Sequence, residues 1–476
     1  MQSFPSVPYN QLRHVKEKLV APPLPHSGLL TDLYELTMAA AYFDNKVQAT
    51  ASFELFVRQL PPERGYLLAA GLELALEFLE EVRFETDEIE FLRGQEVFAR
   101  VSDNFFDYLR KFHFTGEAWA IPEGTPVFAG EPLLRVTAPI IEAQVVETYL
   151  LSTLSFQTLI ATKAARVVEA AGGRGVVEFG TRRAHGPQAG TLAARAAYVG
   201  GCIGTSNVQA GLRFGIPTFG TLAHSFVMAY DDEGESFRQF SKVFPDHAIL
   251  LVDTYDPLAA IEKIIRLGLR PRGVRLDSGD LVTLSRAVRR KLDQAGLTET
   301  RIFASGDLNE YAIADALREG APVDFFGVGT ELATSKDVPA LGTVYKLVQL
   351  DDGSGLRSRA KFSEDKRTYP GCKQVYRFHD SGGLYSGDIV GLTEEAFPDS
   401  EPLLSCVMRG GRRLGAGPKL AQIRERAGET LSRLPSKYRQ LRAAPPYPVR
   451  MSAGLEALLE EVRHQMLQPA AGEGAG

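Results

Sequence analysis

The sequence predicts an α/β protein whose central part is a parallel sheet, closed as a barrel. From about residue 150 onward, short runs of β-branched and aromatic residues alternate with amphipathic stretches of helical length. The unit recurs at intervals of roughly 25 residues, as a strand, a crossover helix and their connections require. No repeat of the sequence itself accompanies this structural period.

The strands and helices of this region can be assigned one by one. Five runs that end in Gly, Asp or Ser are predicted strands: 176–180, 249–253, 274–277, 302–305 and 325–329. Three amphipathic stretches between the later runs are predicted helices: 257–267, 281–294 and 309–319. We therefore assign residues 151–343 to the barrel.

Residues 29–150 are predicted to form a separate domain that mixes helices and antiparallel strands. The pair Thr31-Asp32 is a helix N-terminal signal at the start of an apolar stripe that runs to residue 43. Alternation predicts a strand at 53–57, and a second amphipathic helix is expected at 67–82. Gly and Pro turns divide 119–137 into short strands.

The remaining segments flank these two domains. Residues 1–28 are rich in proline and are predicted to be an N-terminal extension. Residues 344–467 begin with a basic strand-and-turn stretch that could fold back onto the first domain. Residues 468–476 lack large apolar side chains and are predicted to be a disordered tail.

The composition narrows the class of ligand. A formal net charge of −6 provides no general basic field for nucleic acid or an anionic membrane, so we expect neither partner and a small ligand instead. The 3 cysteines contain no CxxC pair, which argues against a disulfide framework and a structural zinc. No secretory or membrane-spanning segment is recognised, so a cytoplasmic location is expected.

Polar residues gather where the predicted strands end. In an α/β barrel these ends and the loops after them build the active site. The segments concerned are EFGTRR at 178–183, GTLAHS at 220–225, DTYD at 253–256, RLDSGD at 275–280, SGD at 305–307 and GVGT at 327–330. One rim therefore collects arginines, a histidine, aspartates and glycines.

Each of these residues also has an ordinary structural explanation. The aspartates could be helix N-caps, which we prefer for Asp256, and the glycines could serve turns. Arg182 and Arg183 could be solvated, and His224 could be a core histidine. Together, however, glycine amides, arginines and paired aspartates suit a phosphorylated sugar with Mg²⁺. No P-loop, HExxH or serine elbow is present.

The same segments resemble one enzyme family. TDLYELT at 31–37, EFGTRRAHGP at 178–187, GTLAHS, RLDSGD and GVGT occur in order and are similar to motifs of nicotinate phosphoribosyltransferases. The resemblance implies an irregular α/β barrel of the type II phosphoribosyltransferase kind, with a split α+β domain formed by N-terminal and post-barrel segments. It also implies ATP-coupled conversion of nicotinate and phosphoribosyl pyrophosphate to nicotinate mononucleotide and diphosphate, the first step of NAD synthesis from nicotinate, with Mg²⁺.

The resemblance also implies roles for individual residues. His224 would take the γ-phosphoryl group of ATP, and Tyr34 would reach the active site of the partner in a homodimer. Phe179 would stack on the pyridine ring, and Asp277 and Asp307 would contact ribose or Mg²⁺. The other expected substrate contacts are Arg182, Arg183, Thr221, Arg275, Ser278, Gly279 and Gly306, with Gly327, Gly329 and Thr330 for the 5′-phosphate.

One position bears on substrate choice, and it leaves alternatives open. Related nicotinamide phosphoribosyltransferases carry an aspartate where Ser206 stands; an aspartate would repel a carboxylate, whereas a serine can donate to one. We therefore predict nicotinate. The alternatives are nicotinamide or quinolinate phosphoribosyl transfer, or a non-catalytic barrel that binds a phosphosugar.

Overall fold

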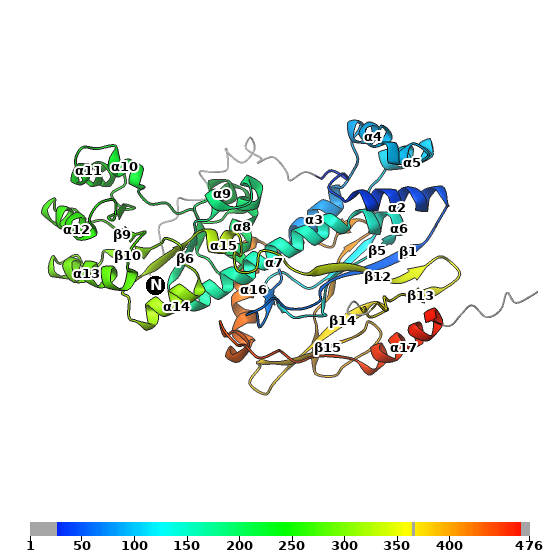
Figure 1. Cartoon of the computed structure of the whole chain (residues 1–476). Helices are drawn as coiled ribbons and strands as arrows, with labels where there is room; N and C mark the ends of the chain where they lie inside the picture. The colour runs from blue at the N-terminus through cyan, green and yellow to red at the C-terminus, as the bar shows by residue number, and fades with distance from the viewer. Residues whose placement is uncertain (1–25, 364–366, 468–476) are drawn as a thin grey trace, which may run out of the picture.

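The computed structural model describes residues 26–363 and 367–467. Figure 1 shows two bodies side by side: a barrel with its helices, and a domain built on antiparallel sheets. The predicted tail and all but the last three residues of the predicted N-terminal extension lie outside the described residues. Among the described residues, no helix is long and apolar enough to span a membrane.

The first domain is built on a seven-stranded sheet whose strands come from segments before and after the barrel. Its order is β13-β12-β1-β5-β3-β17-β18. The N-terminal strands are β1 (Thr50–Val57), β3 (Glu117–Ala120) and β5 (Pro132–Pro139). The post-barrel strands are β12 (Thr343–Asp351), β13 (Leu356–Ser358), β17 (Ser405–Arg409) and β18 (Arg412–Arg413). Because β12 pairs antiparallel with β1, the split α+β domain of the predicted fold class is confirmed.

Helices also belong to this domain or lead from it into the barrel. They are α2 (Leu33–Asp44), α3 (Leu72–Glu81), α4 (Thr86–Arg93), α5 (Asp103–Arg110), α6 (Ile140–Val145) and α7 (Glu147–Ala170). The single helix expected at 67–82 is wrong, because β2 (Leu67–Leu68) pairs with β4 (Pro126–Val127) before α3 begins. Gly71 separates the two with a φ of 101°, and a Cβ there would lie 2.9 Å from the Thr153 carbonyl oxygen.

The barrel is built from six parallel strands in the order β7-β6-β11-β10-β9-β8. They are β6 (Gly175–Glu178), β7 (Gly204–Thr205), β8 (Ile249–Leu251), β9 (Gly273–Leu276), β10 (Arg301–Ala304) and β11 (Phe325–Val328). All five predicted strand runs are confirmed. Val176, Leu250, Val274, Ile302 and Phe326 are buried in the core between strands and helices.

An irregular segment closes the ring between β7 and β8. Thr205 N donates to Pro217 O at 3.0 Å and Phe219 N donates to Thr205 O at 2.9 Å on one side of it. On the other side, Leu222 N donates to Ile249 O at 3.3 Å. Since no regular strand forms here, the barrel is irregular, in agreement with the predicted fold class.

Helices surround the barrel strands. They are α8 (Pro187–Val199), α9 (Val208–Phe214), α10 (His224–Met228), α11 (Glu233–Val243), α12 (Pro257–Arg266), α13 (Leu281–Gln294), α14 (Glu310–Arg318) and α15 (Thr330–Ala333). The sequence predicts α13 with the observed bounds, and α12 and α14 within one residue at each end. Asp256 caps α12 as expected, accepting from Ala259 N at 2.7 Å.

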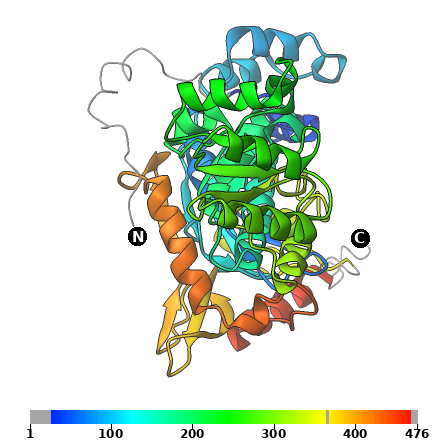
Figure 2. The same cartoon turned by 90° about the vertical axis from the view of Figure 1, so that its left-hand side faces the viewer.

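A smaller four-stranded sheet completes the chain. Its strands are β14 (Lys373–His379), β15 (Tyr385–Leu392), β16 (Ser400–Pro402) and β19 (Val449–Met451), and its flanking helices are α16 (Leu420–Arg433) and α17 (Ala453–Leu467). Figure 2 shows α16, in orange, lying along one side of the barrel. Arg424 fastens it there by donating to Cys202 O at 3.1 Å and Gly201 O at 3.0 Å.

Candidate active site

Arg275 is the polar centre of the barrel rim. It lies on β9, and its side chain is 13% exposed. Its guanidinium donates from Nε to Ser305 Oγ at 2.7 Å and from Nη1 to Thr221 Oγ1 at 2.8 Å, while Nη2 pairs with the Asp277 carboxylate. One planar group therefore joins the ends of β9 and β10 to the irregular segment that closes the barrel.

The Asp277 carboxylate is held in its charged form. It accepts from Ser305 Oγ as well as from Arg275. Burial acts to raise the pKa of Asp277, but the Ser305 hydrogen bond and the Arg275 charge outweigh burial, so this pKa lies below its ordinary value. At neutral pH the rim therefore presents an anionic oxygen beside a fixed guanidinium.

A second aspartate supports this arrangement from the neighbouring strand. Asp253 Oδ2 accepts from Asp277 N and from Ser278 Oγ, each at 2.8 Å. Its other oxygen, Oδ1, is buried and has no hydrogen-bond partner among the described residues. An ordinary N-cap role does not explain Asp253, because Asp256 caps the following helix. Sequence reasoning left Asp253 out of the predicted site.

His224 is the first residue of α10 and faces this acidic group. Its Nδ1 is 3.1 Å from Thr254 Oγ1, and its Nε2 is 3.9 Å from Asp277 Oδ2. The side chain is 44% exposed, so it is not a core histidine. The geometry leaves an imidazole nitrogen open to a ligand at the rim. Thr254, which orients the ring, was also missed from the sequence, because hydroxyl partners carry no spacing signal.

An aromatic surface lies next to the polar centre. The Phe179 ring follows β6 and stacks on Phe303 with the centroids 5.6 Å apart and the planes inclined by 15°. The Arg275 Cζ atom lies 5.7 Å from the Phe179 ring centroid. A Cβ at Gly327 would approach the Phe179 ring to 2.6 Å, so glycine is needed there for the ring to occupy this position.

Ser206 is tied to the same strand end. Its backbone N donates to the Glu178 carbonyl at 2.9 Å, just before Phe179. The Glu178 carboxylate accepts from Thr205 Oγ1 at 2.5 Å and from Gly180 N. Burial raises the pKa of Glu178 against these two hydrogen bonds. Ser206 and Phe179 are thus brought to the ends of adjacent strands.

Loops with unusual backbone conformations complete the rim. Gly279 and Gly306 have φ values of 83° and 87°, and a Cβ at Gly306 would lie 1.9 Å from Asp277 O. Asp307 is a non-glycine residue with a φ of 41° and is exposed. Gly329 precedes the short helix α15, which Thr330 begins. Close backbone approach of this kind is typical of loops that surround phosphate.

The remaining predicted site residues are placed less centrally. Arg182 and Arg183 lie exposed on a 3₁₀ turn, Thr181–Arg183, directly after Phe179 and Gly180. Tyr34 is 47% exposed on α2, which Figure 1 shows in the antiparallel domain, away from α10 and the rim. Partial burial and the carboxylates of Glu147 and Glu35 raise the Tyr34 pKa. Within one chain, Tyr34 is therefore not brought to His224.

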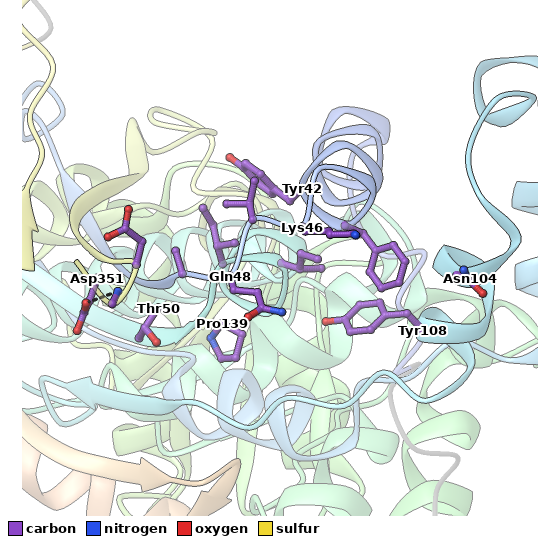
Figure 3. A pocket seen from close by; sticks show the side chains of 15 residues that line it. Tyr42, Lys46, Gln48, Thr50, Asn104, Tyr108, Pro139 and Asp351 are labelled. Carbon is purple, nitrogen blue, oxygen red and sulfur yellow. Dashed lines mark hydrogen bonds between the residues drawn. The ribbon is translucent and has the colours of Figure 1, made fainter. Parts of the chain in front are cut away.

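A cavity of about 980 Å³ lies elsewhere in the molecule (Figure 3). Tyr42 of α2, Lys46 just after that helix, Tyr108 of α5 and Asp351 of β12 are among the residues that line it. None of the predicted site residues does so. Its place in the antiparallel domain separates it from the Arg275 cluster.

Comparisons with known proteins match most of the chain. Three family models match: the nicotinate phosphoribosyltransferase N-terminal domain at residues 29–155, the quinolinate phosphoribosyl transferase C-terminal domain at 160–339, and the nicotinate phosphoribosyltransferase C-terminal domain at 396–459. The middle match covers the barrel. The first and third matches cover the N-terminal and C-terminal segments that contribute strands to the antiparallel sheets.

Relatives and solved structures agree with these matches. A nicotinate phosphoribosyltransferase of Mycobacterium tuberculosis (strain ATCC 25618 / H37Rv) is 47% identical over 92% of this chain and 95% of its own. That of Bacillus subtilis (strain 168) is 39% identical over 89% and 93%. The crystal structure of human nicotinic acid phosphoribosyltransferase superposes with a TM-score of 0.80 at 31% identity, covering 91% of this chain and 99% of that one. The chain belongs to the nicotinate phosphoribosyltransferase family.

Proposed function

We propose that this protein transfers the phosphoribosyl group of phosphoribosyl pyrophosphate to nicotinate, giving nicotinate mononucleotide and diphosphate. The relatives that match over most of the chain carry this activity in their names. The observation that carries the proposal is the Arg275 cluster, which gathers Thr221, Asp277 and Ser305 beside Phe179. A planar carboxylate substrate and a phosphorylated sugar could be bound there next to each other.

The chemistry requires no protein nucleophile. The pyridine nitrogen attacks the anomeric carbon as the bond from that carbon to the diphosphate oxygen breaks. Positive charge develops on the ribose, so carboxylates near the sugar stabilise the transition state and cations stabilise the departing diphosphate. The charged Asp277 would provide the carboxylate near the sugar. The exposed Arg182 and Arg183, which follow β6, would provide the cations that stabilise the departing diphosphate.

Nicotinate would bind between the aromatic surface and donors for its carboxylate. Phe179 provides a ring face, and Gly327 leaves room for that ring. Ser206 at the adjacent strand end offers a hydroxyl donor, which suits a carboxylate better than an aspartate would. This arrangement supports nicotinate over nicotinamide, and the relatives named for nicotinate support the same choice.

Mg²⁺ fits the acidic side of the rim. Asp253 Oδ1 has no hydrogen-bond partner among the described residues, and Asp277 lies beside it with a second oxygen facing His224. Mg²⁺ is usually held by one or two carboxylates together with substrate phosphates and water. Asp253 and Asp277 would hold it, with Asp307 from the next loop a third candidate. When bound, the ion would neutralise diphosphate charge.

ATP coupling would use His224. An uncharged imidazole nitrogen can attack the γ-phosphorus of ATP, so that an N–P bond forms and ADP leaves. Water would later cleave that bond and release phosphate, which would favour product formation. The half-exposed ring and its orientation by Thr254 support this role.

A homodimer would complete the site, since Tyr34 is exposed but distant from the rim of its own chain. We propose that it reaches the rim of a second copy. A cytoplasmic location stays a prediction of the sequence.

The test is incubation with γ-labelled ATP and Mg²⁺ in the absence of the other substrates. We expect acid-labile label on the wild-type protein and none on His224→Ala. An unlabelled wild-type protein would refute ATP coupling through His224. Product formation from nicotinate, nicotinamide and quinolinate, followed in parallel, tests the transfer itself, and no product from any of them would favour the non-catalytic alternative.

A further inference from the structure

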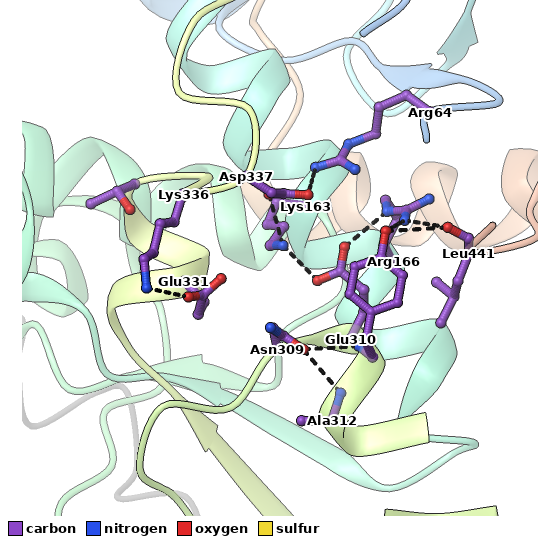
Figure 4. A network of polar contacts seen from close by, with 12 residues as sticks. Arg64, Lys163, Arg166, Asn309, Glu310, Ala312, Glu331, Lys336, Asp337 and Leu441 are labelled. Carbon is purple, nitrogen blue, oxygen red and sulfur yellow. Dashed lines mark hydrogen bonds and ion pairs between the residues drawn. The ribbon is translucent and has the colours of Figure 1, made fainter. Parts of the chain in front are cut away.

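A cluster of charged side chains, buried except for Asp337, joins α7 to two loops that leave the barrel rim (Figure 4). Lys163 of α7 is 1% exposed, and its Nζ forms ion pairs with Glu310 Oε2 at 2.6 Å and Asp337 Oδ1 at 2.9 Å. Glu310 begins α14, after β10, whereas Asp337 follows α15, after β11. One ammonium group therefore pairs with carboxylates from two loops that follow different strands, β10 and β11.

Each carboxylate also has a second cation of its own. Arg166 Nε lies 3.0 Å from Glu310 Oε1, and Arg64 Nη2 lies 2.8 Å from Asp337 Oδ2. Burial acts to raise the pKa of Asp337, but hydrogen bonds from Lys163 and Arg64 bring it to about 2. Lys163 is thus the member of the cluster that contacts both carboxylates.

The two loops contain residues whose backbone conformations shape the rim. The loop after β10 includes Gly306 and Asp307, both with positive φ, and it ends at Glu310. The loop after β11 runs from Gly329 through α15 to Asp337. Lys163, Arg166 and Glu310 are buried, so a displaced charge there would lose its partner in a poorly solvating interior. Asp337 is partly open to solvent, with its side chain 31% exposed, but it is held by two cations, Lys163 and Arg64. The cluster is therefore suited to setting the distance between the loops.

We propose that Lys163 is a positioning residue that fixes the loops after β10 and β11 relative to each other. The identity of the ligand rests on the proposed function: the ribose would contact the first loop and the 5′-phosphate the second. These two parts of phosphoribosyl pyrophosphate are separated by a nearly constant distance, so a change in loop spacing weakens binding of the whole molecule. Lys163 itself does not reach the rim.

The direct test measures backbone amide hydrogen exchange in the ligand-free protein. Lys163→Met removes the shared cation, while Arg166 and Arg64 still pair with the two carboxylates and preserve the fold. We expect exchange to accelerate by about tenfold in peptides covering both 305–310 and 329–337. Asp337→Asn should accelerate exchange in the second peptide only. Acceleration in only one loop of Lys163→Met, or in neither, would overturn the proposal.

The matched control is Arg195→Met. Arg195 is also a buried cation, and its Nη2 pairs with Glu123 Oε2 at 2.9 Å, but it contacts neither loop. We expect Arg195→Met to leave exchange in both loops unchanged. If it reproduced the Lys163→Met pattern, general loosening would explain the effect and the specific role of Lys163 would be refuted.

Kinetics provide the second readout. We expect Lys163→Met to raise the KM for phosphoribosyl pyrophosphate by about tenfold and to leave the KM for nicotinate within about twofold. Equal changes in both KM values would contradict a role in loop spacing. A wild-type protein that forms no nicotinate mononucleotide would instead refute the proposed function, and the exchange measurement would still decide the coupling of the loops.

Discussion

Replacing Arg275 by lysine tests whether the rim is assembled around this guanidinium. Arginine makes three contacts from β9, to Ser305, Thr221 and Asp277. A lysine ammonium is a single point of charge and can keep only the contact with Asp277 at best. The variant therefore loses two charge-assisted hydrogen bonds without losing the positive charge.

The size of the effect follows from those two bonds. A hydrogen bond from a charged donor contributes about 1.5 kcal/mol, so two contribute about 3 kcal/mol. The side chain is 13% exposed, which limits compensation by water. Since substrate would have to bind to a less ordered rim, we expect kcat/KM for the transfer reaction to fall about 100-fold.

The assay is steady-state formation of nicotinate mononucleotide, with unfolding by denaturant followed in parallel. Arg301→Lys is the matched control, because Arg301 lies at the opposite end of the neighbouring strand and is 54% exposed in its pair with Asp324. The control should stay within about twofold of the wild-type protein. If Arg275→Lys also stayed within that range, the guanidinium would not organise the site.

Three further predictions follow from individual residues. Ser206→Asp should shift preference from nicotinate towards nicotinamide in a competition assay, and an unchanged preference would contradict the donor role of Ser206. Gly327→Ala should raise the KM for nicotinate by about tenfold, because its Cβ would lie 2.6 Å from the Phe179 ring, whereas Gly342→Ala, with no atom within 4 Å, should not. Burial raises the pKa of Glu35 to about 7, against hydrogen bonds from two threonines. The folded state then binds more protons than the unfolded state between pH 4.5 and 7, so stability should fall as pH rises through this range. The Tm of the wild-type protein should therefore fall relative to the Tm of Glu35→Gln from pH 5 to pH 8. A constant Tm difference between the two proteins would refute the raised pKa of Glu35.

Local patterns predicted five of the six barrel strands and the helices α12, α13 and α14, because strand and helix alternate regularly in this part of the chain. The helix at 281–294 has the predicted bounds, and the five strand runs end where the polar segments begin. The rim then follows from topology, since parallel strands place their carboxyl ends together. The sequence therefore predicts that Arg275, Asp277 and His224 lie at one site.

The errors and omissions have a common cause. The helix expected at 67–82 begins later, because Leu67 and Leu68 pair with a strand that is distant in sequence. Asp253 and Thr254 were left out of the site because their partners lie on other strands and loops. Lys163 and Arg166 of α7 carry charge but are buried, and no local pattern indicates which residues pair with them. Periodicity reports which residues share a face, and it does not report what covers that face.

The sequence was sufficient for the α/β class, the parallel barrel and the family, since these depend on patterns that lie within a few residues of each other. Only the tertiary structure decided how the ring closes through 217–222, which donors surround Asp277, and how α7 connects two rim loops through Lys163. Those features depend on contacts between residues far apart in the chain. Their free energy comes from burial and from the pairing of charges, neither of which a local pattern contains.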